Sequence, residues 1–264
     1  MKNEHKISPS NASLMPDLIQ FNRPYSRHFL DIFGMRGISE NSCALDIGSG
    51  SELGDLPIIR NLGAGLCVGI DIVWNEARRR ESSSFFALVQ GDIDGGKLPF
   101  VDDSFDYVIL NNVIEHLHNP VKLLQEIRRV LVPGGLLAVL TPNQANLKNR
   151  LKLLLGGSIY FPLNRWLNPD DHIKKHGTIV FTGHIREYTA NEIISMLSLT
   201  ELNIISTQYL IAHFQSSSRD APRLTGVDSV ERISQSSFIF KLYRFAERLH
   251  PGWRYMISVV AEKH

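Results

Sequence analysis

The amino-acid sequence predicts an α/β fold built on a doubly wound sheet of about seven strands, with the last strand antiparallel. Short apolar runs alternate with helical segments through the first half of the 264-residue chain, which is typical of a parallel sheet covered on both faces. Near the end, Tyr255–Ala261 alternates and is rich in Val and Ile, so we expect it to close the sheet as the antiparallel strand. A hydrophobic content of 43% allows a large core.

Six further strands and several helices are expected before this last strand. The strands are Cys43–Ile47, Leu66–Ile70, Phe86–Gln90, Tyr107–Leu110, Leu136–Thr141 and Leu202–Leu210. A helix between the fourth and fifth strands is indicated by Asn119 as N-cap, Pro120 in the first turn and Pro133-Gly134-Gly135 after its end. Its apolar residues recur every three to four positions through Leu131. Thr189–Leu199 and Phe238–Leu249 are the later expected helices.

The whole chain, residues 1–264, is expected to form one domain with two insertions on the side of the substrate. These insertions are residues 144–183 and 211–252, and residues 142–183 show no clear strand. Gly156-Gly157 is a candidate hinge in the first insertion. The candidate apolar cover over the active site is Leu151, Leu154, Phe161 and Trp166.

Composition and charge exclude several classes of protein. A net charge of +1, from 28 basic and 27 acidic residues, gives no general attraction to nucleic acid, and no nucleic-acid partner is expected. Cys43 and Cys67 stand inside apolar runs, as buried thiols in a reducing compartment do. The sequence contains no apolar stretch of membrane-spanning length and no apolar signal core, so a cytoplasmic location is expected.

A glycine turn follows the first expected strand. Gly48 and Gly50 let the backbone turn tightly and approach a ligand, and Asp46 can accept a hydrogen bond from a cationic amine. A dinucleotide-binding loop needs a further glycine where Leu53 stands, and no phosphate-binding Gly-Lys-Ser/Thr sequence is present. The loop is therefore a poor site for a pyrophosphate.

Acidic residues also follow the second and third strands. Asp71 ends Val-Gly-Ile-Asp, a position from which a carboxylate can bind both hydroxyls of a ribose. Asp92 stands beside Ile93 after the third strand, where a carboxylate and an apolar side chain suit an adenine ring. Either acid alone is equally typical of a turn or a helix cap. Three acids after three successive strands together favour a nucleoside-containing ligand.

The runs LDIGSG, VGIDI, GDI, LPFVDDSFDYVILNNVIEHLHNP and LLQEIRRVLVPGGLLAVLTPN resemble the class I S-adenosylmethionine (SAM)-dependent methyltransferases. The similarity covers about residues 40–143 and is strongest to the branch that modifies small molecules and quinones. It implies a Rossmann-like fold, methyltransferase activity and SAM as cofactor. The cofactor contacts it implies are Asp46, Gly48 and Gly50 for the methionine part, Asp71 for the ribose, Asp92 and Ile93 for the adenine, and Asn111 beside the sulfonium. Ser49 and Ile72 are further expected cofactor-binding residues.

Methyl transfer to a hydroxyl also needs a group that takes the proton, and histidine is suited to this near neutral pH. His116 and His184 are the candidate catalytic residues, although a structural histidine is the commoner case. Glu115-His116 with a later His184 is also similar to the metal-dependent small-RNA 2′-O-methyltransferases. We expect no metal, because Asn112 stands where their first glutamate would be and magnesium prefers oxygen ligands.

The acceptor is expected to be a small, lipid-linked or sugar-linked molecule, and the expected acceptor atom is oxygen. Residues 147–167 combine basic residues with many Leu and aromatic residues, which is typical of an amphipathic lid and also of a surface that contacts a membrane peripherally. Metal-assisted RNA 2′-O-methylation and a non-catalytic SAM-binding protein remain alternatives. The sequence leaves the oligomeric state undetermined.

Overall fold

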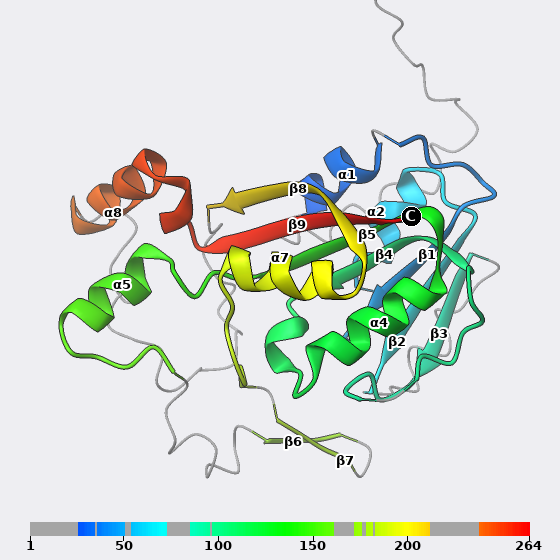
Figure 1. Ribbon diagram of the computed structural model, residues 1–264, viewed down its shortest axis with the longest axis horizontal. Helices are drawn as coiled ribbons and strands as arrows, with labels where there is room; N and C mark the ends of the chain where they lie inside the picture. The colour runs from blue at the N-terminus through cyan, green and yellow to red at the C-terminus, as the bar shows by residue number, and fades with distance from the viewer. Residues whose placement is uncertain are drawn as a thin grey trace, which may run out of the picture.

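A computed structural model of the chain describes residues 26–34, 36–50, 54–72, 85–95, 97–160, 172–175, 178–181, 183–211 and 238–264. Its centre is a seven-stranded sheet in the order β3-β2-β1-β4-β5-β9-β8 (Figure 1). The strands are β1 (Cys43–Ile47), β2 (Leu66–Asp71), β3 (Phe86–Gln90), β4 (Phe105–Asn111), β5 (Leu131–Pro142), β8 (Leu202–Leu210) and β9 (Met256–Lys263). Strand β9 pairs antiparallel with both β5 and β8, so the predicted Rossmann-like sheet with its antiparallel last strand is confirmed.

Helices cover both faces of the sheet because the central strands are apolar on both sides. The helices are α1 (Ser26–Gly34), α2 (Leu56–Asn61), α4 (Pro120–Val130), α5 (Leu147–Leu154), α7 (Ala190–Leu199) and α8 (Phe238–Leu249), with 3-10 turns η3 (Ile114–His116) and η5 (Pro251–Trp253). Helices α4 and α7 contribute to one buried apolar cluster against the sheet. Helices α1 and α2 contribute to a second cluster, built on side chains from the opposite face of the same strands.

Helix α4 begins as predicted and ends earlier than predicted. The Asn119 side chain accepts a hydrogen bond from the Lys122 backbone N–H at 3.2 Å, with Pro120 in the first turn. The helix ends at Val130, and Leu131 is already extended because it pairs with Phe105 of β4. The prediction that Leu131 belongs to the helix was wrong. Pro133-Gly134-Gly135 lies where the register of β4 and β5 shifts, so it marks an irregularity within β5.

The first predicted insertion contains a pair of strands that the sequence pattern did not predict. Strand β6 (His172–Lys175) pairs antiparallel with β7 (Thr178–Phe181) in a separate two-stranded sheet. The expectation of no strand in this segment was wrong. His-Ile-Lys-Lys has no alternation of apolar and polar residues, so only the pairing with its neighbour identifies it as a strand. No described helix is both long and apolar enough to cross a membrane.

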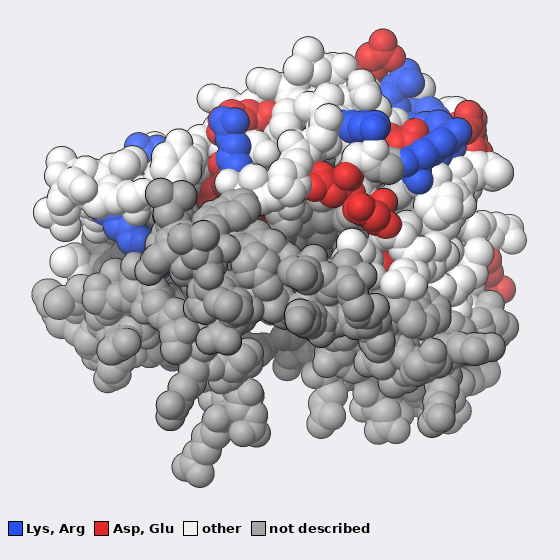
Figure 2. Space-filling model, turned by 90° about the horizontal axis from the view of Figure 1, so that it is seen from below, with Lys and Arg blue, Asp and Glu red and all other residues white. Residues whose placement is uncertain are grey.

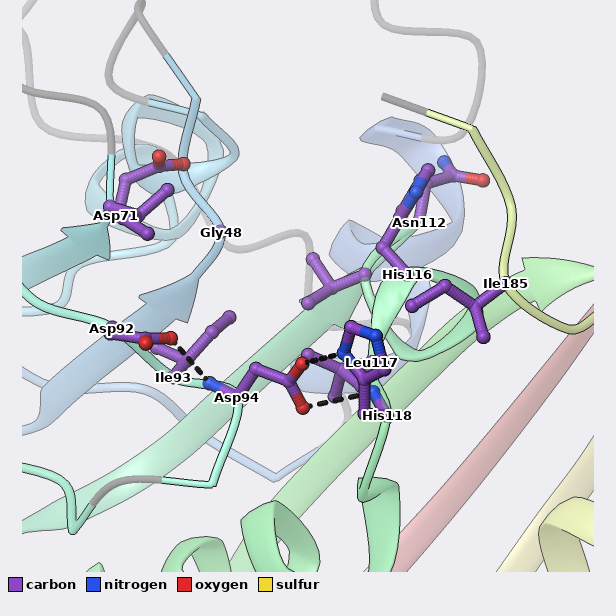
Figure 3. A pocket seen from close by; sticks show the side chains of 12 residues that line it. Gly48, Asp71, Asp92, Ile93, Asp94, Asn112, His116, Leu117, His118 and Ile185 are labelled. Atoms are coloured by element: carbon purple, nitrogen blue, oxygen red, sulfur yellow. Dashed lines mark hydrogen bonds and ion pairs between the residues drawn. The ribbon is translucent and has the colours of Figure 1, made fainter. Parts of the chain in front are cut away.

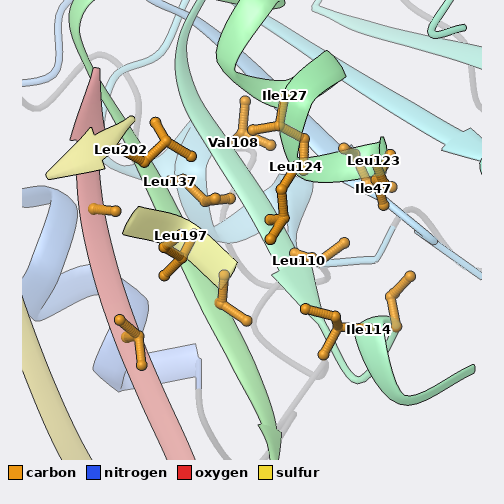
Figure 4. Packing of buried hydrophobic residues seen from close by; sticks show 14 of the residues in the cluster. Ile47, Val108, Leu110, Ile114, Leu123, Leu124, Ile127, Leu137, Leu197 and Leu202 are labelled. Carbon is orange, nitrogen blue, oxygen red and sulfur yellow. The ribbon is translucent and has the colours of Figure 1, made fainter. Parts of the chain in front are cut away.

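The packing of α4 on the sheet generates a stability prediction. Figure 4 shows Leu124 and Ile127 of α4 pointing toward Val108 and Leu110 of β4, and all four side chains are fully buried. Replacement Leu124→Ala leaves a cavity there and should lower the free energy of unfolding by about 2–5 kcal/mol. Urea denaturation measures this, and Gln125→Ala on the exposed side of the helix should change it by less than about 0.5 kcal/mol. An equal effect of both replacements would contradict the packing described.

Candidate active site

A cavity of about 380 Å³ lies beyond the carboxyl ends of β1 to β4, the edge at which α/β sheets bind ligands. Figure 3 shows Asp71 and Asp92 on one side of it and Asn112, His116 and Ile185 on the other. The residues lining it are Gly48, Asp71, Ile72, Asp92, Ile93, Asp94, Asn112, Val113, His116, Leu117, His118 and Ile185.

The glycine turn after β1 brings backbone close to the cavity. Gly48 has a φ of 72°, and a Cβ built there would lie 2.4 Å from a methyl carbon of Val113, so the turn requires glycine. Behind it, the buried Asp46 carboxylate accepts the Asp55 backbone N–H at 2.7 Å. Asp46 therefore holds the turn in shape and does not line the cavity.

Asp71 connects the end of β2 to the glycine turn. Its Oδ2 accepts the Gly50 backbone N–H at 2.7 Å, and its side chain lines the cavity beside Ile72. A carboxylate offers acceptor sites on two oxygens. A carboxylate that this hydrogen bond orients can therefore receive hydrogen bonds from hydroxyls of a ligand.

Asp94 joins the loop after β3 to the loop before α4. Its carboxylate accepts from His118 Nδ1 at 2.5 Å and from the backbone N–H groups of His118 and Asn119 at 2.9 and 3.2 Å. Asp92, which is exposed, accepts the Asp94 N–H at 2.9 Å (Figure 3). These contacts fix the two loops that form the floor around Ile93.

The two asparagines after β4 have different positions. Asn111 donates from Nδ2 to the Asp55 carboxylate at 2.8 Å, and its Oδ1 accepts from Asn112 Nδ2 at 2.8 Å. Asn112 adopts a left-handed backbone with φ of 53° and lines the cavity, a conformation that asparagine tolerates better than most residues. The resemblance implied that Asn111 would border the sulfonium, and the residue that lines the cavity is its neighbour.

Two histidines and a buried glutamate meet at the other side of the cavity. Ligand atoms of Glu115, His116 and His184 all lie within 4.8 Å of one another, and the two imidazole rings stand edge to face at 5.0 Å. The backbone explains this meeting, because the Glu115 carbonyl accepts the N–H groups of Ile185 and Arg186 at 2.8 and 3.1 Å. These bonds hold the segment before α7 against η3.

Each of the three side chains has a shifted pKa. Burial raises the pKa of Glu115 to about 7, opposed in part by the hydrogen bond from Thr141. Burial, together with the neighbouring His184, lowers the pKa of His116. Burial also acts to lower the pKa of His184, but the hydrogen bond to Glu187 and the charge of Glu115 outweigh it and raise that pKa.

Six of the predicted site residues line the cavity and five lie behind or beside it. Those that line it are Gly48, Asp71, Ile72, Asp92, Ile93 and His116. Those behind or beside it are Asp46, Ser49, Gly50, Asn111 and His184. Sequence reasoning did not predict a site role for Asp94, Asn112, Val113, Leu117 or Ile185. The only signal for these was their position directly after β3 and β4, or next to a predicted residue.

Little of the predicted apolar cover can be located at the cavity. Phe161 and Trp166 lie outside the described residues, as does Leu53. The described parts of 144–182 contribute no side chain to the cavity lining. Leu151 is exposed, and Leu154 is 81% exposed. The role of this insertion as a lid stays a prediction.

Comparison with known proteins finds a family that matches the residues from β1 into β5. Residues 45–139, which run from β1 into β5, match the family described as a methyltransferase domain. Over this stretch the chain is therefore similar to methyltransferase domains. The resemblance to SAM-dependent methyltransferases that the motifs implied is confirmed, and it implies SAM as the cofactor of this domain.

Curated relatives match part of the chain. Demethylmenaquinone methyltransferase of Staphylococcus aureus is 32% identical over 116 residues, which cover 42% of this chain and 47% of that protein. The chain spans about a third to a half of the length of the curated relatives it matches.

Solved structures agree with the fold. A SAM-dependent methyltransferase from Mesorhizobium loti superposes with a TM-score of 0.53 at 16% identity, covering 89% of this chain and 97% of that one. The [4+2]-cyclase SpnF superposes with a TM-score of 0.51 at 16% identity, covering 90% of this chain and 80% of that one. Since one of these neighbours is a cyclase, the fold alone does not determine the reaction.

The residues present fit SAM. A Cβ at Gly48 would press on Val113, so the turn keeps the room that a close ligand needs. Asp71 is held where a carboxylate can accept from ribose hydroxyls, and Asp92 beside Ile93 offers an acceptor and an apolar surface for an adenine.

This arrangement predicts a strong effect of Asp71 on SAM binding. Replacement Asp71→Ala removes a charged hydrogen-bond acceptor. It should weaken the binding free energy of SAM by about 1.5–3 kcal/mol, which raises the dissociation constant roughly 10- to 100-fold. Calorimetric titration with SAM measures this, with Asp31→Ala at an exposed position of α1 as the control. An unchanged dissociation constant in folded Asp71→Ala protein would remove Asp71 from the cofactor site.

Proposed function

We propose that the protein transfers a methyl group from SAM to a nucleophile on a small, lipid-linked or sugar-linked acceptor, and that the nucleophile is an oxygen atom. One observation carries the proposal: a single cavity joins the residues suited to the cofactor, Asp71 and Asp92, to His116 on the opposite side. Both halves are needed, because methyl transfer requires the cofactor and the acceptor to meet in line. SAM supplies the electrophilic methyl group when it is bound.

The chain's residues have separate tasks in this proposal. Asp71 and Asp92 hold the nucleoside end, and the turn at Gly48 brings backbone against the cofactor. Val113 and Ile185 contribute apolar surface that excludes water. We assign the acceptor end to His116, which lines the cavity, and to His184 beside it.

The two alternatives differ from this proposal in what can be measured. An RNA 2′-O-methyltransferase would label RNA, whereas the near-neutral net charge of +1 favours a smaller acceptor. A non-catalytic SAM-binding protein would bind the cofactor and label nothing. The cyclase among the structural neighbours shows that proteins of this fold can also catalyse other reactions.

Replacement of His116 should reduce methyl transfer without changing the affinity for SAM. Protein incubated with methyl-labelled SAM and fractionated cell extract should transfer label to the small-molecule or lipid fraction. Replacement His116→Ala should reduce this transfer at least about 100-fold, the effect of losing a side chain that acts on the reacting group. The exposed His264→Ala serves as control. Label only in RNA, or normal transfer by His116→Ala protein, would contradict the proposal.

Helix α5 supports a lipid-linked acceptor. Its end exposes Leu153, Leu154 and Leu155 at 55%, 81% and 85%, and its basic residues are accompanied by no acidic residue within Leu147–Leu154. On the face drawn in Figure 2, the end of the molecule that carries α5 and α8 shows Lys and Arg without Asp or Glu. Exposed leucines among basic residues suit an anionic membrane surface.

Binding to vesicles tests this surface. We expect the protein to sediment with phosphatidylserine-containing vesicles, and the double variant Arg150→Glu, Lys152→Glu to bind at least about tenfold more weakly, since each basic residue near such a surface contributes about 1 kcal/mol. Lys97→Glu, Lys122→Glu, which changes exposed lysines elsewhere, is the matched control. Equal binding by both double variants would show that α5 is not the contact.

A further inference from the structure

We propose that Glu115, His116 and His184 bind one divalent metal ion of the zinc class at the acceptor end of the cavity. The motif comparison disfavoured a metal because magnesium needs oxygen ligands and Asn112 replaces a glutamate. The assembled site offers a different set of donors, two imidazole nitrogens and one carboxylate oxygen. That set suits zinc or ferrous iron and not magnesium.

The hydrogen bonds of both histidines fix which nitrogen can bind an ion. His116 Nδ1 lies 3.0 Å from the Gly183 carbonyl oxygen, which can only accept, so Nδ1 carries the proton and donates. His184 Nδ1 lies 3.1 Å from the Glu187 carboxylate and donates in the same way. In the neutral imidazole each Nε2 then carries a lone pair. A histidine whose other nitrogen donates to a carbonyl or carboxylate is the usual arrangement of a metal ligand.

Glu115 supplies the third donor and the negative charge. The side chain is completely buried, and its Oε2 accepts from Thr141 at 3.0 Å. Its Oε1 has no hydrogen-bond partner and lies 4.0 Å from His116 Nε2. A buried carboxylate oxygen without a partner requires an explanation. A cation between the carboxylate and the two rings would compensate it.

The three ligand atoms lie farther apart than they would around a bound ion, but small movements would bring them to the distances that an ion requires. Ligand atoms at about 2.1 Å from zinc in a tetrahedral arrangement lie about 3.4 Å apart, so the present 4.0 and 4.8 Å require inward movements of about 1 Å. The position of His184 is supported by Glu187, whose carboxylate also accepts a hydrogen bond from the buried Asn149 at 3.1 Å.

The remaining coordination position would face the cavity. His116 lines the cavity and its side chain is 31% exposed, whereas Glu115 is closed off from solvent. Three protein ligands and one open position are typical of a catalytic metal site. Its use for an acceptor oxygen rests on the proposed function, but metal binding itself does not.

Zinc titration of the metal-stripped full chain tests the proposal. Calorimetry should show one site that is lost in Glu115→Gln and His184→Ala, and a roughly 10- to 100-fold lower affinity in Glu187→Gln, which leaves the three ligands in place and weakens the support of His184. Excess Mg²⁺ should not compete. Added Co²⁺ should give the visible absorption of a four- or five-coordinate ion in the wild type and not in Glu115→Gln or His184→Ala. His264→Ala should bind zinc as the wild type does.

SAM titration of the same samples separates the two proposals. The wild type, Glu115→Gln and His184→Ala should bind SAM equally, which also shows that the variants are folded. Equal zinc affinity in the wild type and both variants, competition by Mg²⁺, or no zinc binding in a wild type that still binds SAM would overturn the metal site. Zinc binding without any SAM binding would overturn the proposed function and leave the metal site standing.

Discussion

The parallel pairing of β1 on both of its edges is the constraint on which the site depends. Strand β1 pairs with β2 through Ile47 opposite Ile70, and with β4 through Ile47 opposite Leu110. This register brings the residues that follow all three strands to one edge of the sheet. Slipping either pair by one residue would turn each apolar side chain to the opposite face. The pairing of β1 with both neighbours therefore fixes the positions of Gly48, Asp71 and Asn112 relative to one another.

One side of the cavity comes from segments that are local in sequence, and the other side depends on a contact between segments far apart in sequence. The side suited to a nucleoside comes from turns that directly follow β1, β2 and β3. The opposite side depends on a contact between η3 and the segment before α7, in which one residue, Glu115, acts twice. Its carbonyl orders the backbone at Ile185 and its carboxylate faces the imidazole of His116. A side-chain substitution at Glu115 tests the role of the carboxylate alone, because the backbone carbonyl remains in place.

Sequence patterns predicted the strands and the first side of the cavity because both depend on local chemistry. Apolar runs and glycine turns identified β1, β2 and β3, and Asp71 and Asp92 follow from their place after strands. The pairing of Leu131 with Phe105 was not predicted, because a partner 26 positions away overrides the helical spacing that Leu131 shares with α4. The left-handed backbone at Asn112 was missed for the same reason. Distinguishing Asn111 from Asn112 requires knowing where β4 ends.

The place of β9 in the sheet has a consequence for how the molecule assembles. Strand β9 lies between β5 and β8 and pairs with both, although residues 143–255 separate it from β5 in the chain. On the ribosome, β8 emerges before the strand that joins it to the rest of the sheet has been made. The edge of β5 also stays unpaired until β9 has been synthesised, and an unpaired strand edge can pair wrongly with another strand. Closure of this half of the sheet is thus a late, long-range step, which slows folding relative to a sheet of the same size joined by neighbours in sequence.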